Sequence, residues 1–232
     1  MFRGQTGAFI ERDGDVQAVS IGENYTIDAG VILGYPSHRD DDRLLIIGSH
    51  AFIRSGTVIY GGTSIGYGLE TGHNVIIREQ NSIGNNLRIW SNSVIDYGCV
   101  IGHNVKIHSN VYIPQFTTLE DDVFIGPGVI LANDIHPGCP RALQCMAGPV
   151  VKKGAQIGVN SCILPRITIG EYAIIGSGSV VTADIPSGAV AYGNPARVCN
   201  QIENIVCTNG LMDKPYKHLD WRLKSANPVS RS

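Results

Sequence analysis

Seven histidines are the side chains of this sequence best suited to moving a proton near neutral pH. One of them, His136, stands immediately before Pro137 and shortly after Asn133 and Asp134. In this arrangement the imidazole can act as a general base, while Asp134 or Asn133 orients it or holds an amine. The alternative is an ordinary turn, in which Asn133 and Asp134 bond only to the nearby backbone.

Three other histidines carry weaker signals. His108 is the second candidate base, and its alternative is a hydrogen-bonded structural role. His73 and His103 each occur in the sequence Gly-His-Asn and are expected to be turn residues. His103 and His108 also have the spacing of two zinc ligands in a γ-type carbonic anhydrase. The third histidine of such a site should stand two coils before His103, at a position that Tyr67 occupies.

A metal-like spacing surrounds the leading histidine. His136 and Cys139 are three residues apart, Cys145 follows, and Asp134 is the nearest available fourth ligand. A structural zinc and a disulfide are therefore open alternatives. Because the first residues hold no apolar run typical of an export signal, we expect a reduced, cytoplasmic protein with free thiols and no metal.

The composition argues against nucleic-acid binding, binding to anionic membranes and a membrane-spanning helix. The 232 residues carry a net charge of −2, so no basic field is available for nucleic acid or an anionic membrane. No stretch of 18 apolar residues occurs, which predicts that no helix spans a membrane. Charged residues make up 16% of the chain against about 25% in ordinary globular domains, while glycine is abundant, with 28 residues. This balance favours a flat-sheeted solenoid.

A repeat of six residues predicts the strands and corners that must position these residues. From Ile47 to Leu131 every sixth residue is Ile or Leu, apart from Thr71. Glycine follows this repeat residue at intervals of 18, at Gly48, Gly66, Gly84 and Gly102. Hexapeptides of this kind predict an all-β parallel β-helix with three faces, in which the repeat residue points inward.

The repeat is interrupted twice. The first break follows Leu33 and predicts a corner loop at 35–45; the second follows Leu131, before the repeat is recognised again at Ile157, and predicts a loop at 132–149. Insertions in a solenoid gather on the face that binds. The count of hexapeptides predicts seven to eight coils over residues 19–198, with residues 1–18 as a lead-in.

The end of the chain predicts a different element. Val198, Ile202, Ile205 and Val206 have helical spacing, and Gly210 is placed to end the helix. Residues 199–232 are therefore expected to form a short C-terminal helix and a tail.

Four segments resemble one known family. They are Gly126–Pro137, Ile157–Pro165, Ile175–Val181 and Gly193–Arg197, and through them residues 19–198 resemble the left-handed β-helix hexapeptide-repeat acyltransferases. A narrower similarity, to nucleotide-sugar N-acyltransferases, rests on Asn133-Asp134, Ile77–Glu79 and Ile205–Tyr216. The resemblance implies left-handed coils, a homotrimer with active sites between subunits, and acetyl-CoA or another acyl-CoA as the donor. It also implies a small-molecule acceptor, the amine of a nucleotide-linked amino sugar.

The resemblance assigns roles to particular residues. His136 stands where hexapeptide O-acetyltransferases carry their catalytic histidine, although many amino-sugar enzymes have an aromatic residue there. CoA is expected along the C-terminal coils, where its arm needs small residues and its phosphates need cations. The small residues are Gly158, Gly176, Ser177 and Gly178, and the cations are Arg166 and Arg197, with Lys152 and Lys153 as further candidates. In the alternative, the glycines only form coil corners and the cations are only solvated.

Three other functions are weighed against this one. An O-acetyltransferase of the same fold would use the same base on a hydroxyl group. The carbonic anhydrase lacks its third histidine, and a non-enzymatic trimeric scaffold would need no corner loops. We therefore predict an acyltransferase, with an N-acetyltransferase ahead of the alternatives.

Overall fold

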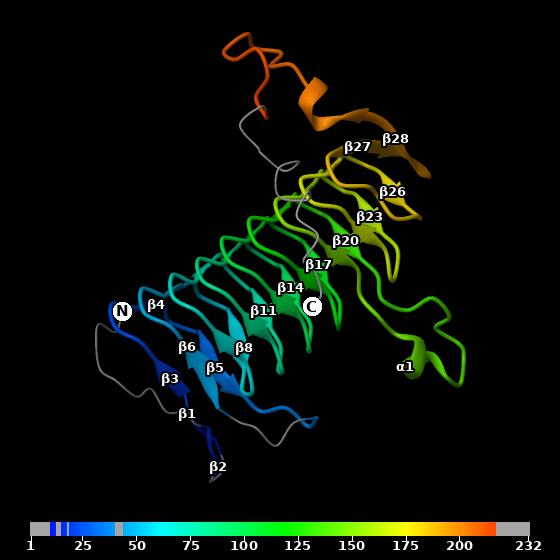
Figure 1. The fold of residues 1–232 in the computed structure, drawn as a ribbon. Coiled ribbons are helices and arrows are strands. Elements are labelled where there is room, and N and C mark those ends of the chain that lie inside the picture. Colours follow the sequence, from blue (N-terminus) through cyan, green and yellow to red (C-terminus); the bar gives the residue numbers. More distant parts are fainter. Residues whose placement is uncertain (1–9, 13–14, 18, 40–43, 217–232) are drawn as a thin grey trace, which may run out of the picture.

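The period of six forms a coil of short strands (Figure 1). The computed structural model describes residues 10–12, 15–17, 19–39 and 44–216. Up to β26, strands two to four residues long alternate with tight corners, and many corners place asparagine at positive φ, such as Asn74, Asn92 and Asn110. Asparagine tolerates this left-handed conformation because its short polar side chain bonds locally. The corners therefore turn the chain onto a new face every six residues.

Three parallel sheets form the faces of the coil. Sheet 1 consists of β3 (Val19–Ile21), β6 (Leu45–Ile47), β9 (Ser64–Ile65), β12 (Ser82–Ile83), β15 (Val100–Ile101), β18 (Thr118–Leu119), β21 (Val150–Val151) and β24 (Thr168–Ile169). Sheet 2 consists of β4 (Thr26–Ile27), β7 (Phe52–Ile53), β10 (Glu70–Thr71), β13 (Arg88–Ile89), β16 (Lys106–Ile107), β19 (Phe124–Ile125), β22 (Gln156–Ile157), β25 (Ile174–Ile175), β27 (Ala189–Gly193) and β28 (Ala196–Gln201). Sheet 3 consists of β5 (Ile32–Tyr35), β8 (Val58–Tyr60), β11 (Ile76–Ile77), β14 (Val94–Ile95), β17 (Tyr112–Ile113), β20 (Ile130–Leu131), β23 (Cys162–Ile163) and β26 (Val180–Val181).

The register confirms the repeat of 18. Ile77 pairs with Ile95, and Ile89 pairs with Ile107, so each coil lies directly on the previous one. The fold is the three-sheet parallel β-helix that the repeat predicts, consistent with the left-handed coils of the resemblance. A separate antiparallel pair, β1 (Ile10–Arg12) and β2 (Asp15–Gln17), precedes the coil. Within the described residues, no helix has the length and apolar character that crossing a bilayer requires.

The inward-pointing repeat residues form the core of the coil. Ile77, Ile95 and Ile113 are fully buried, as are most members of the series. The polar member, Thr71, is buried as well, and its hydroxyl accepts a hydrogen bond of 2.9 Å from the Arg54 backbone N–H. The Thr57 hydroxyl lies 3.4 Å away from the same oxygen. Thr71 therefore fits the core because its polar atom has partners.

The repeat resumes earlier than the sequence indicated. Val151 is fully buried and pairs with Leu119, so β21 belongs to sheet 1, one hexapeptide before Ile157. This hexapeptide was not recognised in the sequence because Val151 lies only two residues after Pro149, at the end of the irregular segment. With β21 included, the three sheets stack eight complete coils, the upper end of the predicted range.

The prediction of a C-terminal helix was wrong. Val198 lies in β28, which pairs antiparallel with β27, and only the short 3-10 helix η1 (Ile202–Asn204) follows. Ile202 is buried, whereas Val198 and Val206 are exposed, so these residues do not form one apolar face. The hairpin prevails because β28 satisfies the edge of sheet 2 that a helix would leave unpaired. The predicted tail beyond Tyr216 lies outside the described residues.

Candidate active site

Both corner loops leave the coil at the same corner (Figure 1). The first follows β5 and the second follows β20, and both strands belong to sheet 3. We call the turns that follow the sheet 3 strands the sheet-3 corner. The second loop carries His136 and a short helix, α1 (Ala142–Cys145). The two insertions therefore lie along one edge of the β-helix. The coils between them provide the surface that connects the two loops.

Polar side chains line this edge at the spacing of the coil. Glu79, Gln115 and Asn133 occupy equivalent positions of different coils, and Arg78 and Asp96 occupy the position before. Such residues stack because each coil is 18 residues long and about 4.8 Å high. The sheet-3 corner therefore carries a ladder of polar groups from one loop to the other.

Asp96 is the most heavily bonded member of the ladder. Its carboxylate is buried, and its Oδ1 accepts a 2.8 Å hydrogen bond from the Tyr97 backbone N–H and lies 3.3 Å from the Arg78 guanidinium. Its Oδ2 accepts hydrogen bonds from the Tyr112 hydroxyl at 2.9 Å and the Gln115 amide at 2.6 Å. Burial, followed by this hydrogen bond to Asp96, raises the pKa of Tyr112 to about 12. Tyr112 therefore remains a protonated donor near neutral pH.

Gln115 connects the ladder to the second loop. While its amide N–H donates to Asp96, its side-chain oxygen accepts a hydrogen bond of 2.5 Å from the Asn133 amide. The backbone oxygen of Asn133 accepts a further bond of 2.9 Å from the Ala147 N–H, which closes the base of the loop. Asn133 thus fixes the loop at its root, a role that was not predicted from the sequence.

Arg78 and Glu79 form an ion pair at the other end of the ladder, in which the carboxylate is buried and the guanidinium is partly exposed. The guanidinium donates two hydrogen bonds to the carboxylate, at 3.1 and 2.9 Å, and the Glu79 side chain is fully buried. Burial alone would raise the pKa of Glu79. Hydrogen bonds from its own backbone, from Arg78 and from Ser37 outweigh burial, and the pKa is lowered. Glu79 is therefore held as a carboxylate and couples the first loop to the coil.

His136 lies on the exposed surface of the second loop. Its backbone N–H donates a 2.9 Å hydrogen bond to Oδ1 of Asp134, and its backbone oxygen accepts one from Cys139. One carboxylate oxygen of Asp134 therefore shapes a local turn, as the alternative interpretation of this segment expected. Because His136 is exposed, its imidazole is accessible to a substrate.

His108 lies at a different corner, after the strands of sheet 2. Its ring packs against Phe124 with centroids 5.1 Å apart. Burial, followed by the charge of Lys106, lowers the pKa of His108, so it is a weaker base than an ordinary histidine. Its place in the fold separates it from the sheet-3 corner that holds the two loops and the ladder.

The small residues proposed for CoA have structural reasons to be small. A Cβ at Gly158 would lie 2.6 Å from the Ser177 backbone N, and one at Gly176 would lie 2.7 Å from the Tyr192 Cβ. Gly178 has a φ of +71° and open space beside it. Close stacking of the coils therefore explains Gly158 and Gly176, while Gly178 and Ser177 leave an open surface at the same end of the coil.

Most of the candidate cations have protein partners. Arg166 donates to the Cys145 backbone oxygen at 3.1 and 2.7 Å and so holds the end of the second loop. Lys152 pairs with Glu120 at 2.7 Å, and Lys153 lies 3.5 Å from Asp122. Arg197 is exposed on the β27–β28 hairpin, where it donates to its neighbour's backbone oxygen at 3.0 Å. Of these four, Arg197 is the most accessible to a phosphate.

The residues weighed as thiol or metal ligands all lie in the described part of the chain. All six cysteines lie there and are free, so Cys139 and Cys145 form no disulfide. Over the same residues, no three His, Cys, Asp or Glu side chains converge as metal ligands. Burial raises the pKa of the Cys99 thiol to about 12, which excludes it as a nucleophile near neutral pH.

Asp96 and Gln115 were not predicted from the sequence as site residues. The available signal was the interval of 18 itself: Glu79, Gln115 and Asn133 are separated by one or two full coils, and all three are polar residues just outside the inward phase. Applying the coil spacing to polar residues, as well as to glycine, would have identified the ladder.

Parts of the coil are similar in sequence to known transferases. A family model described as bacterial transferase hexapeptide (six repeats) matches residues 82–115 and 148–183. The chain is 65% identical over 49 residues to the dTDP-3-amino-3,6-dideoxy-alpha-D-galactopyranose 3-N-acetyltransferase of Aneurinibacillus thermoaerophilus, covering 21% of this chain and 26% of that protein. It is 33% identical over 113 residues to the galactoside O-acetyltransferase of Escherichia coli, covering 47% of this chain and 52% of that protein.

These matches are partial. The chain spans about a quarter of the first relative's length and about half of the second's. Among solved structures, a mutant GDP-perosamine N-acetyl transferase from Caulobacter crescentus is 22% identical with a TM-score of 0.38, covering 62% of this chain and 57% of that one. The repeat and these sequence matches make the matched part of this chain similar to hexapeptide-repeat transferases.

Proposed function

We propose that this chain is an acyl-CoA-dependent N-acetyltransferase whose acceptor is the amine of a nucleotide-linked amino sugar. The observation that carries the proposal is the hydrogen-bonded ladder Asp96–Gln115–Asn133, which ends at the root of the loop that presents His136. A pure scaffold has no need to fix an exposed histidine in this way. The 65% identity to a dTDP-amino-sugar N-acetyltransferase over 49 residues supports this class of acceptor.

The reaction requires a neutral amine and a stabilised oxyanion. The amine nitrogen attacks the thioester carbon, the carbonyl oxygen takes up the negative charge, and the C–S bond then breaks to release the CoA thiolate. The amine loses one proton, which the His136 imidazole accepts and passes to the thiolate. His136 suits this role because its ring is exposed and its backbone is fixed by Asp134 at 2.9 Å. No covalent enzyme intermediate is needed.

The donor has its place at the C-terminal coils. The open surface at Ser177 and Gly178 accommodates the pantetheine arm of acetyl-CoA, and Gly158 and Gly176 keep neighbouring coils close. Arg197 offers its exposed guanidinium to a phosphate. Arg166 acts instead through the second loop, whose Cys145 oxygen it binds. The protein's cytoplasmic location stays a prediction.

We also propose that the protein is a homotrimer. The outward residues of sheet 3 are apolar on nearly every coil: Ile32, Val58, Ile76, Val94, Tyr112, Ile130, Cys162 and Val180. The equivalent positions of sheet 2 include Glu70, Arg88 and Lys106, and those of sheet 1 include Ser64 and Ser82. A contiguous apolar face of this kind favours burial against another subunit. It also borders the corner that carries both loops, so a neighbouring subunit would adjoin the active site.

O-acetyl transfer is the second candidate. Two observations favour it: the presence of a histidine before Pro137, and the match to a galactoside O-acetyltransferase over 113 residues. A hydroxyl acceptor needs the base more than an amine does, because a neutral amine is already a competent nucleophile.

A thiol-release assay tests the proposed function. Acetyl-CoA is offered with dTDP-, UDP- and GDP-linked amino sugars, and release of free CoA is followed with a thiol reagent. We expect turnover with at least one of the three acceptor types and an acetamido product by mass spectrometry. Absence of turnover across the panel would contradict the proposal, and an acetate ester as product would replace it with the second candidate.

A further inference from the structure

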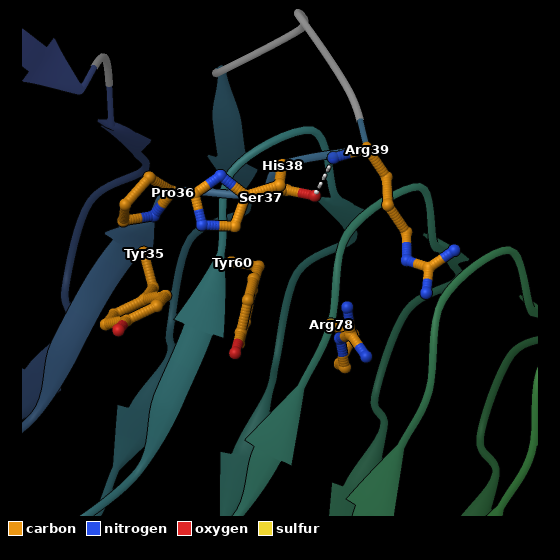
Figure 2. A pocket seen from close by; sticks show the side chains of 7 residues that line it. All are labelled: Tyr35, Pro36, Ser37, His38, Arg39, Tyr60 and Arg78. Carbon is orange, nitrogen blue, oxygen red and sulfur yellow. Dashed lines mark hydrogen bonds between the residues drawn. The ribbon is translucent and has the colours of Figure 1, made fainter.

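A pocket opens beside the first loop, at the sheet-3 corner (Figure 2). Its volume is about 520 Å³, and its walls come from Tyr35 to Arg39 together with Tyr60 and Arg78. None of these residues has a role in the chemistry proposed above. Figure 2 shows the two tyrosine rings on one side and the two guanidinium groups on the other.

The tyrosines provide an aromatic platform. The ring centroids of Tyr35 and Tyr60 are 5.0 Å apart and their planes are inclined by 54°. The Arg78 guanidinium lies 5.3 Å from the Tyr60 centroid, which places a cation at the edge of the platform. Neither tyrosine is fully buried, so both can offer surface to a ligand. Platforms of this kind hold nucleobases by stacking, whichever base is present.

The cations of the pocket differ in availability. Arg78 is neutralised by Glu79 at 2.9 Å and by Asp96 at 3.3 Å. Arg39 is more exposed and lies 3.9 Å from Glu79, a carboxylate already paired with Arg78. Its guanidinium also rests 4.7 Å above the Tyr97 ring. Arg39, with the exposed ring of His38 beside it, is therefore the group best placed to receive an anion.

The pocket lies along the same corner of the coil as the root of the second loop. Tyr60, Arg78 and Asp96 occupy the same position on three successive coils, and the ladder continues through Gln115 to Asn133. The coil of Tyr60 is four steps from the coil of Asn133, which at about 4.8 Å a step is about 19 Å. In a nucleoside diphosphate sugar, a ribose and two phosphates separate the base from the sugar ring, so the acceptor would lie extended along this corner.

We propose that this pocket binds the nucleoside diphosphate part of the acceptor, with the base against Tyr35 and Tyr60 and the phosphates at Arg39. The sugar then runs along the sheet-3 corner and presents its amine to the second loop. The inference rests on the proposed function for the identity of the acceptor. CoA also contains a nucleoside phosphate, but its proposed site is at the C-terminal coils, near Gly178, beyond the second loop.

Direct binding of dTDP, UDP and GDP to the full chain tests the pocket by isothermal titration calorimetry. We expect at least one of them to bind, and Tyr60→Leu to raise its Kd about tenfold because one stacking face is lost. Tyr60→Phe keeps the ring and should retain the affinity. Arg39→Ala changes an exposed residue, leaves the core intact, and should also weaken binding about tenfold.

Matched controls lie elsewhere on the coil. Arg54 is partly exposed and lies 4.2 Å over Phe52, so it reproduces the Arg39–Tyr97 arrangement at another corner. Tyr67 is an exposed tyrosine outside the pocket. Arg54→Ala and Tyr67→Leu should leave the Kd of the nucleotide unchanged.

The outcomes separate this inference from the proposed function. If none of the three nucleotides binds the unmodified chain, or if Tyr60→Leu and Arg39→Ala bind as well as it does, the inference is overturned. A parallel loss of CoA affinity would assign the pocket to CoA and would also overturn it. If the nucleotide binds as expected but no amino sugar is acetylated, the pocket assignment stands and the proposed function fails.

Discussion

At the scale of single residues, the main distinction is between groups that position and groups that react. Asp96 and Gln115 are bonded on all sides within the protein and hold other groups in place. His136 has a fixed backbone and an exposed ring. A base needs both properties, because it must be oriented and must also reach the substrate. The central chemical expectation therefore concerns His136.

Removing the imidazole should slow turnover without preventing donor binding. His136→Ala is expected to lower kcat about 100-fold, the lower end of the range for general-base catalysis, while the Kd for acetyl-CoA is unchanged. His108→Gln serves as the matched control, and its kcat should be near normal because His108 lies at another corner. Steady-state kinetics and calorimetry supply the two numbers. An unchanged kcat in His136→Ala would leave the substrate amine or His108 as the base.

The pH profile gives an independent assignment of the base. Burial beside Lys106 lowers the pKa of His108 below its usual 6.5, so a reaction driven by His108 would keep its rate at lower pH than an ordinary histidine allows. We expect that His108→Gln leaves the acid limb of the kcat/KM profile in place. Displacement of that limb by His108→Gln would identify His108 as the titrating base.

At the scale of elements, the 18-residue coil stacks equivalent side chains of successive coils into rows along the prism. Asparagine corners, buried isoleucines and the polar sheet-3 corner all repeat at 18 residues because parallel strands stack in register. The same stacking leaves little room between coils, which is why some glycines cannot carry a side chain. The stability of the site therefore depends on contacts between coils.

One consequence is a pH-dependent stability that originates at Glu79. Because the folded state lowers its pKa, this carboxylate stabilises the fold above its unfolded value of 4.5, and the contribution is lost as pH falls below that value. Glu79→Gln should therefore flatten the loss of stability that occurs as pH falls through 4.5 and below. Urea unfolding at several pH values measures this slope. A variant with the same slope as the unmodified chain would contradict the assignment.

A second consequence concerns coil packing. Gly158→Ala would place its Cβ 2.6 Å from backbone atoms of the next coil, so it should lower the free energy of unfolding by about 1–3 kcal/mol. Gly138 lies in the second loop with nothing within 4 Å of its Cβ position, and Gly138→Ala should be nearly neutral. Chemical denaturation of the two variants compares them directly. Equal stabilities would show that the coils can separate to admit a methyl group.

The sequence predicted some levels of this organisation and not others. The period of six predicted the coil, the inward Ile77 and Ile95, and both interruptions, because a repeat enforces the same local geometry many times. It did not predict β28, since the apolar spacing from Val198 to Val206 fits a helix as well as a strand that pairs with β27. It also gave no sign that Arg166 would bind the Cys145 oxygen, a contact that depends on the path of an irregular loop.

At the scale of the whole molecule, the three faces of the coil have different chemistry. The outward positions of sheet 3 are apolar on each coil, while those of the other two sheets mix polar or charged residues with apolar ones such as Val100 and Phe124. The apolar face adjoins the corner with both loops, the polar ladder and the pocket. Assembly and catalysis would therefore meet at one edge of the prism, which links the proposed trimer to the proposed activity.

A charge placed on the apolar face should disrupt the assembly. Ile76 lies at an outward position of sheet 3, and Ile76→Lys is expected to convert a trimer into monomers because it would bury an unpaired charge. Ser82→Lys, at the equivalent outward position of sheet 1, is the matched control and should leave the trimer intact. Light scattering coupled to size exclusion gives the mass of each. An unchanged mass in Ile76→Lys would exclude sheet 3 as the interface.

The central claim is that an amine on a nucleotide-linked sugar is the group that accepts the acetyl. The most direct measurement compares kcat/KM for two acceptors that differ only by an amine or a hydroxyl at one sugar carbon, with the products identified by mass spectrometry. The account predicts a large preference for the amine, at least about 100-fold, and an acetamido product. Equal rates, or an ester formed from the hydroxyl acceptor at the higher rate, would contradict it.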